Sequence, residues 1–274
     1  MRRNELYGNV DPFSQKWRDL YEERKLEVQL IFEPQYGVPK HPLKGWLVED
    51  LLPCGYLVLL AGKPKDGKTN LVATLAHAIS QGLPFAGMRT AHQNVLYISA
   101  EESGEEWRLA MDPYLPKERE GFRVGFSQDF RLDYNPDLWG LARAIDHYKA
   151  ALVVIDPLLA AVDAGDFSNA NRARNALTGL KALCMNKGVT AIVVHHAKER
   201  RGLARRVAEN PQLAATASLN IVLNQRPYHG KRLVTLDLKG RGPFANRTLK
   251  LLSDGPCQYS GLPSSSPRGK MLVD

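Results

Sequence analysis

The segment at residues 62–69 constrains the fold more than any other part of this sequence. It reads Gly-Lys-Pro-Lys-Asp-Gly-Lys-Thr, which matches the pattern G-x-x-x-x-G-K-[ST]. An apolar run at Tyr56–Ala61 precedes it, and a helical pattern over residues 68–81 follows it. A glycine turn between a buried strand and a helix start presents backbone N–H groups and the positive end of the helix dipole. The segment therefore predicts a phosphate-binding loop in an α/β fold.

The residue types in this loop suit the parts of a nucleoside triphosphate. Lys68 is expected to reach the β- and γ-phosphates, and Thr69 to offer its hydroxyl to Mg²⁺. The predicted nucleotide-binding residues are Gly62, Lys63, Pro64, Lys65, Asp66, Gly67, Lys68, Thr69 and Asn70. ATP and Mg²⁺ are the expected cofactors, and a glycine turn without a ligand is the alternative.

Strand-like and helical patterns alternate through the middle of the chain. Strands are expected at Tyr56–Ala61, Val95–Ser99, Phe122–Phe126, Leu152–Ile155 and Ala191–His195, and helices near 68–81, 104–112, 135–149 and 168–187. This order predicts an α/β fold with a mostly parallel twisted sheet and helices on both faces. Further runs at 219–223, 232–238 and 248–252 leave no room for crossover helices, so we expect an antiparallel C-terminal extension.

The ends of the chain differ in composition from its middle. An amphipathic helix is expected over residues 12–26, followed by a loop with three prolines. The last 20 residues are rich in proline and serine. We therefore expect an N-terminal arm at 1–44, a nucleotide-binding domain at 45–255 and a flexible tail at 256–274.

Charge and cysteine content restrict the class of protein. Lys plus Arg number 37 against 29 Asp plus Glu, a net charge of +8, which favours polyanionic partners as well as simple solubility. The three cysteines form no CxxC pair, which argues against a disulfide framework or a zinc site. No apolar run is long enough to cross a bilayer or to form an N-terminal signal, so we expect a cytoplasmic protein without membrane contact.

Carboxylates follow two of the expected strands. Asp156 ends an apolar run, where it can hold the hydration shell of Mg²⁺ or act as a simple turn residue. Glu101 follows the run at Val95–Ser99, where it would orient the attacking water, with Glu102 as the second candidate. Both glutamates can also be solvated side chains that open the next helix.

These features together resemble the RecA-fold ATPases over about residues 45–255. The resemblance is carried by the loop at 62–69, Tyr97-Ile98-Ser99-Ala100-Glu101, the Asp156 strand, Val193-Val194-His195-His196 and Lys239-Gly240-Arg241. Within this fold they look most like the small RepA-type hexameric helicases of plasmids and phages, which are related to the DnaB helicases. The resemblance implies ATP hydrolysis by a homo-oligomer that acts on single-stranded DNA. As in that family, the expected oligomer is a hexamer.

The resemblance also implies roles for individual residues. Glu101 would be the catalytic carboxylate, Lys68 the lysine that binds phosphate, and Asp156 the carboxylate that binds the metal through its hydration water. His196 would be the polar sensor that links the γ-phosphate to the DNA-binding loops, although periodicity alone favours a core histidine. Lys239 and Arg241 would reach into the nucleotide of the next subunit. Lys65 is a departure, because many phosphate loops carry glycine there.

A basic run follows His196 directly. Residues 197–207 contain Lys198, Arg200, Arg201, Arg205 and Arg206 against one acidic side chain. A loop of this charge beside a γ-phosphate sensor favours contact with DNA phosphates without base readout, and a solvated basic loop is the alternative. The leading hypothesis is an ATP-driven ring helicase in the replication of a mobile replicon. A RecA-type DNA-binding filament ATPase and a regulatory or loader ATPase with slow turnover remain alternatives.

Overall fold

One nine-stranded sheet organises the computed structural model, which describes residues 45–115, 120–162, 170–196, 211–240 and 246–261. Its strands are β3 (Leu57–Gly62), β4 (Asn94–Ser99), β5 (Phe122–Phe126), β6 (Ala150–Asp156), β7 (Thr190–His196), β8 (Leu219–Tyr228), β9 (Lys231–Gly240), β10 (Arg247–Gly255) and β11 (Gln258–Gly261). Their spatial order is β11-β10-β9-β8-β3-β7-β6-β4-β5. The strands from β8 to β5 are parallel, whereas β9, β10 and β11 are antiparallel. The predicted mostly parallel sheet with an antiparallel extension is confirmed.

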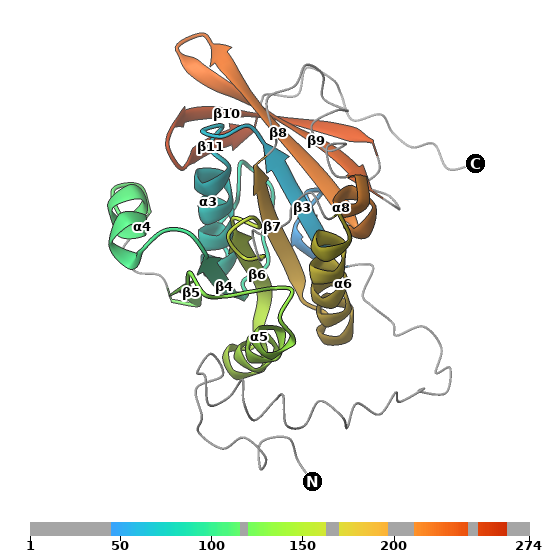
Figure 1. Ribbon diagram of the computed structural model, residues 1–274. Helices are drawn as coiled ribbons and strands as arrows, with labels where there is room; N and C mark the ends of the chain where they lie inside the picture. Colours follow the sequence, from blue (N-terminus) through green and yellow to red (C-terminus); the bar gives the residue numbers. More distant parts are fainter. Residues whose placement is uncertain (1–44, 116–119, 163–169, 197–210, 241–245, 262–274) are drawn as a thin grey trace, which may run out of the picture.

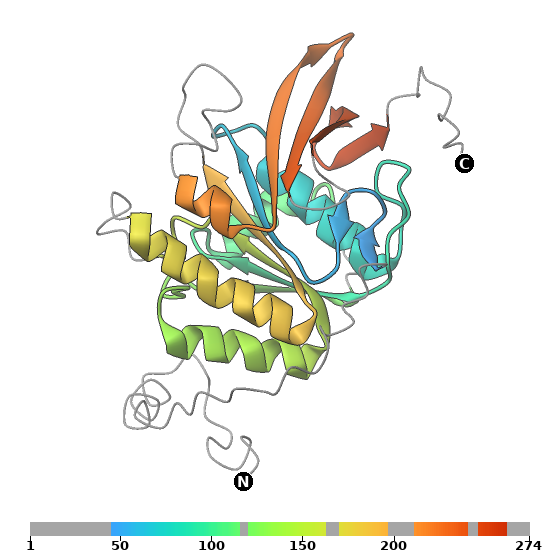
Figure 2. The ribbon, with the colours of Figure 1, turned by 90° about the vertical axis from the view of Figure 1, so that its right-hand side faces the viewer.

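Helices cover both faces of the sheet. They are α3 (Lys68–Gln81), α4 (Gly104–Met111), α5 (Asn135–Tyr148), α6 (Ala170–Lys187) and the short α8 (Pro211–Thr216). Figures 1 and 2 show α3 on one face and α5 with α6 on the other, while α4 stands beyond the β4–β5 edge. The four longer helices lie where the sequence predicted them. None of the helices in the described part of the chain is long and apolar enough to span a membrane.

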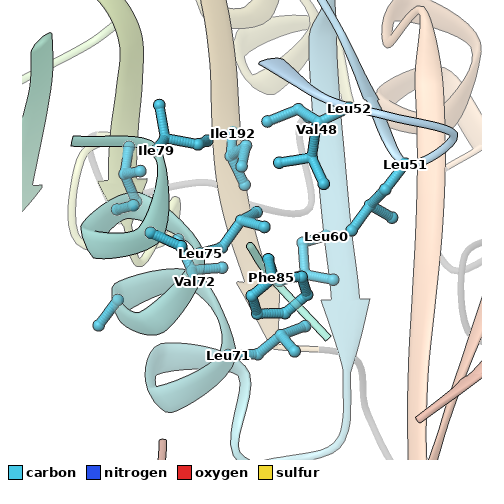
Figure 3. Packing of buried hydrophobic residues seen from close by; sticks show 14 of the residues in the cluster. Val48, Leu51, Leu52, Leu60, Leu71, Val72, Leu75, Ile79, Phe85 and Ile192 are labelled. Atoms are coloured by element: carbon cyan, nitrogen blue, oxygen red, sulfur yellow. The ribbon is translucent and has the colours of Figure 1, made fainter. Parts of the chain in front are cut away.

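Alternation along β3 explains why the core has two layers. Val58 and Leu60 pack with Leu71 and Leu75 of α3, whereas Leu59 faces the layer beneath α5 and α6. Figure 3 shows the α3 side, where the apolar stripe of the helix points at Leu60 and at Ile192 of β7. Because both faces of β3 are buried, the strand is apolar throughout, and the phosphate loop follows directly after its end.

Some elements differ from the prediction. β8 pairs parallel with β3 on one side and antiparallel with β9 on the other, so the antiparallel extension begins at the β8–β9 pair, and α8 lies in the connection from β7 to β8. A six-residue helix is too short to produce a periodic signal. Gln258–Gly261 of the expected tail forms β11 against β10, and Tyr259 packs on Phe85, 5.8 Å between ring centroids. A small two-stranded sheet, β1 (Trp46–Val48) with β2 (Leu52–Pro53), was not predicted.

Several predicted features lie outside the described residues. They are the N-terminal helix over 12–26 with the rest of the arm, the basic run with Lys198, Arg200, Arg201, Arg205 and Arg206, Arg241, and residues 262–274 of the tail.

Candidate nucleotide-binding site

The predicted phosphate loop joins the end of β3 to the start of α3. Gly67 precedes the helix with φ 76°, a left-handed conformation in which glycine carries no steric penalty. Gly62 is required for another reason, since a Cβ there would lie 3.0 Å from the carbonyl oxygen of Leu223 on β8. The two glycines of the motif therefore allow the turn and the close approach of β8.

Lys68 is buried under this loop. Its ammonium group donates to the carbonyl oxygens of Lys63, at 2.6 Å, and Gly62, at 3.1 Å. Burial lowers the pKa of Lys68, while the charges of Asp66 and Asp156 act in the opposite direction. A buried ammonium group held by carbonyl oxygens at the mouth of the loop is suited to bind phosphate oxygens, because their negative charge neutralises it.

The middle of the loop departs from the usual composition at Lys65. This residue has φ 64°, so a lysine occupies a left-handed conformation that favours glycine. The side-chain amide of Gln225 donates to the carbonyl oxygen of Lys65 over 3.1 Å. Asp66 accepts a hydrogen bond from the backbone N–H of Lys63 at 3.2 Å. The loop geometry is thus kept by contacts from β8 and from within the loop.

Asp156 lies at the carboxyl edge of the sheet near Lys68. Register places it opposite Ser99 of β4, and β7 separates β6 from β3. Asp156 is 6% exposed, and its carboxylate accepts a hydrogen bond from the hydroxyl of Tyr97 at 2.6 Å. Tyr97 is fully buried, and burial with the nearby carboxylate raises its pKa, so it remains a donor.

The donor set fits Mg²⁺ bound to a nucleotide. Thr69 offers a hydroxyl at the start of α3, and Asp156 offers its second carboxylate oxygen, for which the described residues provide no hydrogen-bond partner. No group of three or more His, Cys, Asp or Glu side chains that could hold a metal occurs among the described residues. Mg²⁺ usually binds through one or two protein oxygens, water and substrate phosphates, so this site needs the nucleotide to be complete.

Glu101 and Glu102 follow β4 at the same edge. Glu101 is exposed, and its charge raises the pKa of His196 in opposition to burial. Glu102 is half-buried; burial raises its pKa, and the charges of Asp156, Glu101 and Glu106 add to the effect. Both carboxylates therefore lie within electrostatic range of the predicted metal and sensor residues.

His196 ends β7 beside Gly62, its register partner on β3. Burial lowers its pKa, and so does the positive charge of Lys68, while Asp156 and Glu101 act in the opposite direction; the net effect favours the neutral ring. Its Nδ1 atom is buried and has no hydrogen-bond partner in the described structure. A neutral imidazole with an uncommitted nitrogen suits a hydrogen-bonding sensor of a neighbouring ligand.

Lys239 is not brought to this site. It is exposed on β9 opposite Asn220, at the end of the β8–β9 pairing far from the loop, whereas Gly62 lies opposite Leu223. Asn220 and Leu223 are three residues apart on β8, a distance of about 10 Å along the strand. The position of Lys239 therefore argues against a role at the phosphate loop of its own chain.

A cavity that the sequence analysis missed adjoins the phosphate loop. It has a volume of about 890 Å³ and lies between residues 65–70, the β8–β9 hairpin and the β10–β11 turn. Aromatic and basic side chains line it, among them Arg226, Tyr228, Arg232 and Tyr259. It is large enough for the sugar and base of a nucleotide whose phosphates lie in the loop. The hairpin has no motif of its own, and only its pairing with β3 brings it to the loop.

Comparisons with known proteins agree with this geometry. A family model described as an AAA domain matches residues 23–202, more than half of the chain. A KaiC-like protein from the hyperthermophilic archaeon Pyrococcus horikoshii, known from a crystal structure, is 20% identical, with a TM-score of 0.54 over 79% of this chain and 94% of that chain. No curated protein sequence matches this one significantly.

Proposed function

This chain belongs to the AAA domain family, and from that premise we propose that it is an ATP-driven motor that translocates on single-stranded DNA and separates its strands. Its fold is RecA-like, with a P-loop for ATP. One observation carries the proposal. Lys68, Asp156 and His196 gather at one sheet edge, and the basic run at 197–207 begins at the residue after His196.

The edge supplies what ATP hydrolysis requires. Lys68 and the loop N–H groups bind the phosphates, while Thr69 and Asp156 hold Mg²⁺ with its water. When bound, Mg²⁺ neutralises charge on the β- and γ-phosphates. Glu101 orients and activates the attacking water, and Glu102 stands next to it as the alternative base. His196 donates or accepts a hydrogen bond that depends on the γ-phosphate.

A second subunit completes the site in this proposal. Lys239 lies away from the loop of its own chain, which supports a role for Lys239 and Arg241 at the nucleotide of a neighbour. A closed ring satisfies every site with the same contact, whereas an open filament leaves one site incomplete at its end. We therefore favour a closed ring, and the resemblance to RepA-type helicases implies six subunits.

The DNA-binding element in this proposal is the basic run. Its charges are Lys198, Arg200, Arg201, Arg205 and Arg206, with no aromatic side chain among residues 197–207. Such a segment binds phosphodiesters without reading bases. Because it follows the strand that ends in His196, loss of the γ-phosphate can change its position. A motor of this type serves the replication of a mobile replicon in the cytoplasm.

Strand separation on a labelled DNA fork tests the proposal. We expect ATP-dependent unwinding, ATP hydrolysis stimulated by single-stranded DNA, and closed six-fold rings in electron micrographs with a non-hydrolysable ATP analogue and an oligonucleotide. Open filaments would instead support a strand-exchange ATPase. DNA binding without ATP dependence and with negligible hydrolysis would support a regulatory or loader ATPase.

A further inference from the structure

We infer that Tyr97 is a positioning residue that orients the Asp156 carboxylate toward Mg²⁺, and this inference rests on the proposed ATPase function. The Tyr97 hydroxyl donates to Oδ2 of Asp156 over 2.6 Å. Both groups are buried, with 1% of Tyr97 and 6% of Asp156 exposed. A short hydrogen bond between buried groups restricts the rotation of the carboxylate.

Strand register explains how the two side chains meet. On adjacent parallel strands, Tyr97 lies opposite Val154 and Ser99 lies opposite Asp156. Residues two apart share a face of the sheet, so Tyr97 and Asp156 both project toward the α3 side. The long tyrosine side chain then spans the diagonal between positions two residues apart. A phenylalanine at this position would fill the same space without reaching the carboxylate.

Aromatic neighbours hold the tyrosine ring in place. Trp107 of α4 lies 5.8 Å from it and Phe122 of β5 lies 6.1 Å from it, both edge to face. These edge-to-face contacts restrict the tyrosine ring and so the direction in which its hydroxyl reaches Asp156.

This arrangement leaves one carboxylate oxygen for the metal. Oδ2 is occupied by Tyr97, while the described residues give Oδ1 no hydrogen bond. Partners of metal-binding groups typically change metal affinity by about 10- to 100-fold when removed. Tyr97 would thus set the Mg²⁺ dependence of nucleotide binding rather than the affinity for the nucleotide alone.

The test uses the full chain with Tyr97→Phe and a readout that needs no turnover. Calorimetric titration with adenylyl imidodiphosphate at several MgCl₂ concentrations, and with EDTA, separates the two contributions. We expect unchanged affinity in EDTA and a Mg²⁺ requirement about tenfold higher than in the wild type.

Phe122→Leu is the matched control, since it loosens the same aromatic cluster and leaves the Tyr97 hydroxyl in place. It should lower the melting temperature without changing the Mg²⁺ requirement. A wild-type Mg²⁺ requirement in Tyr97→Phe, or the full shift in Phe122→Leu, would overturn the inference while the ATPase proposal stands. A wild-type protein that binds no analogue at all would overturn both.

Discussion

The ammonium group of Lys68 donates a hydrogen bond of 2.6 Å to the carbonyl oxygen of Lys63, five residues earlier in the same loop. This contact holds the lysine across the phosphate loop before any nucleotide binds. It places the charge of a buried side chain, 3% exposed, where phosphate oxygens would lie. Preorganisation of this kind reduces the cost of ordering the side chain on binding.

Lys68→Ala is expected to weaken nucleotide binding strongly. A charge-assisted hydrogen bond to phosphate contributes about 1.5–3 kcal/mol, so the loss of this cation weakens binding by about 10- to 150-fold. Titration with a fluorescent ADP measures it. Lys63→Ala is the control, because Lys63 contributes backbone atoms to the loop. Retained affinity in Lys68→Ala would place the nucleotide elsewhere.

Glu101→Gln is expected to bind ATP normally and to hydrolyse it about 10²- to 10⁴-fold more slowly, the range for removal of a general base. Steady-state turnover and analogue binding are measured together. Glu102→Gln is the paired variant and should retain most activity. If the two variants exchange behaviour, the half-buried Glu102 is the base.

Arg241→Ala is expected to preserve ATP affinity and to lower turnover, because a trans-acting arginine contributes about 10³- to 10⁵-fold in rate. Mixing it with Lys68→Ala protein should restore some activity, since mixed assemblies contain intact shared sites. Lys239→Ala should follow the same pattern. A mixture as inactive as its components would argue against a site shared between subunits.

Alanine at both Arg200 and Arg201 is expected to weaken binding to single-stranded DNA and to flatten its salt dependence. Each lost phosphate contact reduces the slope of log affinity against log salt by about 0.7. Fluorescence anisotropy across a salt series measures the slope. Lys250→Ala, an exposed lysine on β10, is the control. Equal slopes for all three proteins would assign DNA binding to another segment.

Lys65→Gly is expected to stabilise the fold by up to about 1 kcal/mol, because glycine adopts the left-handed φ of 64° without penalty. Urea denaturation measures the free energy of unfolding. Lys63→Gly is the comparison, since Lys63 has no positive φ and the substitution only adds freedom to the unfolded chain. Equal destabilisation by both substitutions would contradict the assigned strain.

Local patterns in the chain determined a large part of this structure. Apolar runs set the buried strands β3, β4, β6 and β7, and the glycines of residues 62–69 set the phosphate loop, because these signals depend only on neighbouring residues. The positions of Lys68, Asp156 and His196 at one edge follow from the alternation of strands and helices. Such features can be predicted from the sequence before any tertiary contact is known.

Tertiary structure alone decided the rest. The Tyr97–Asp156 hydrogen bond joins residues 59 positions apart, and the Gln225–Lys65 contact joins residues 160 apart. The parallel pairing of β8 with β3 brings the β8–β9 hairpin to the phosphate loop and creates the adjoining cavity. Strand order and cross-sheet register arise from the packing of the whole core, and no local run of residues encodes them.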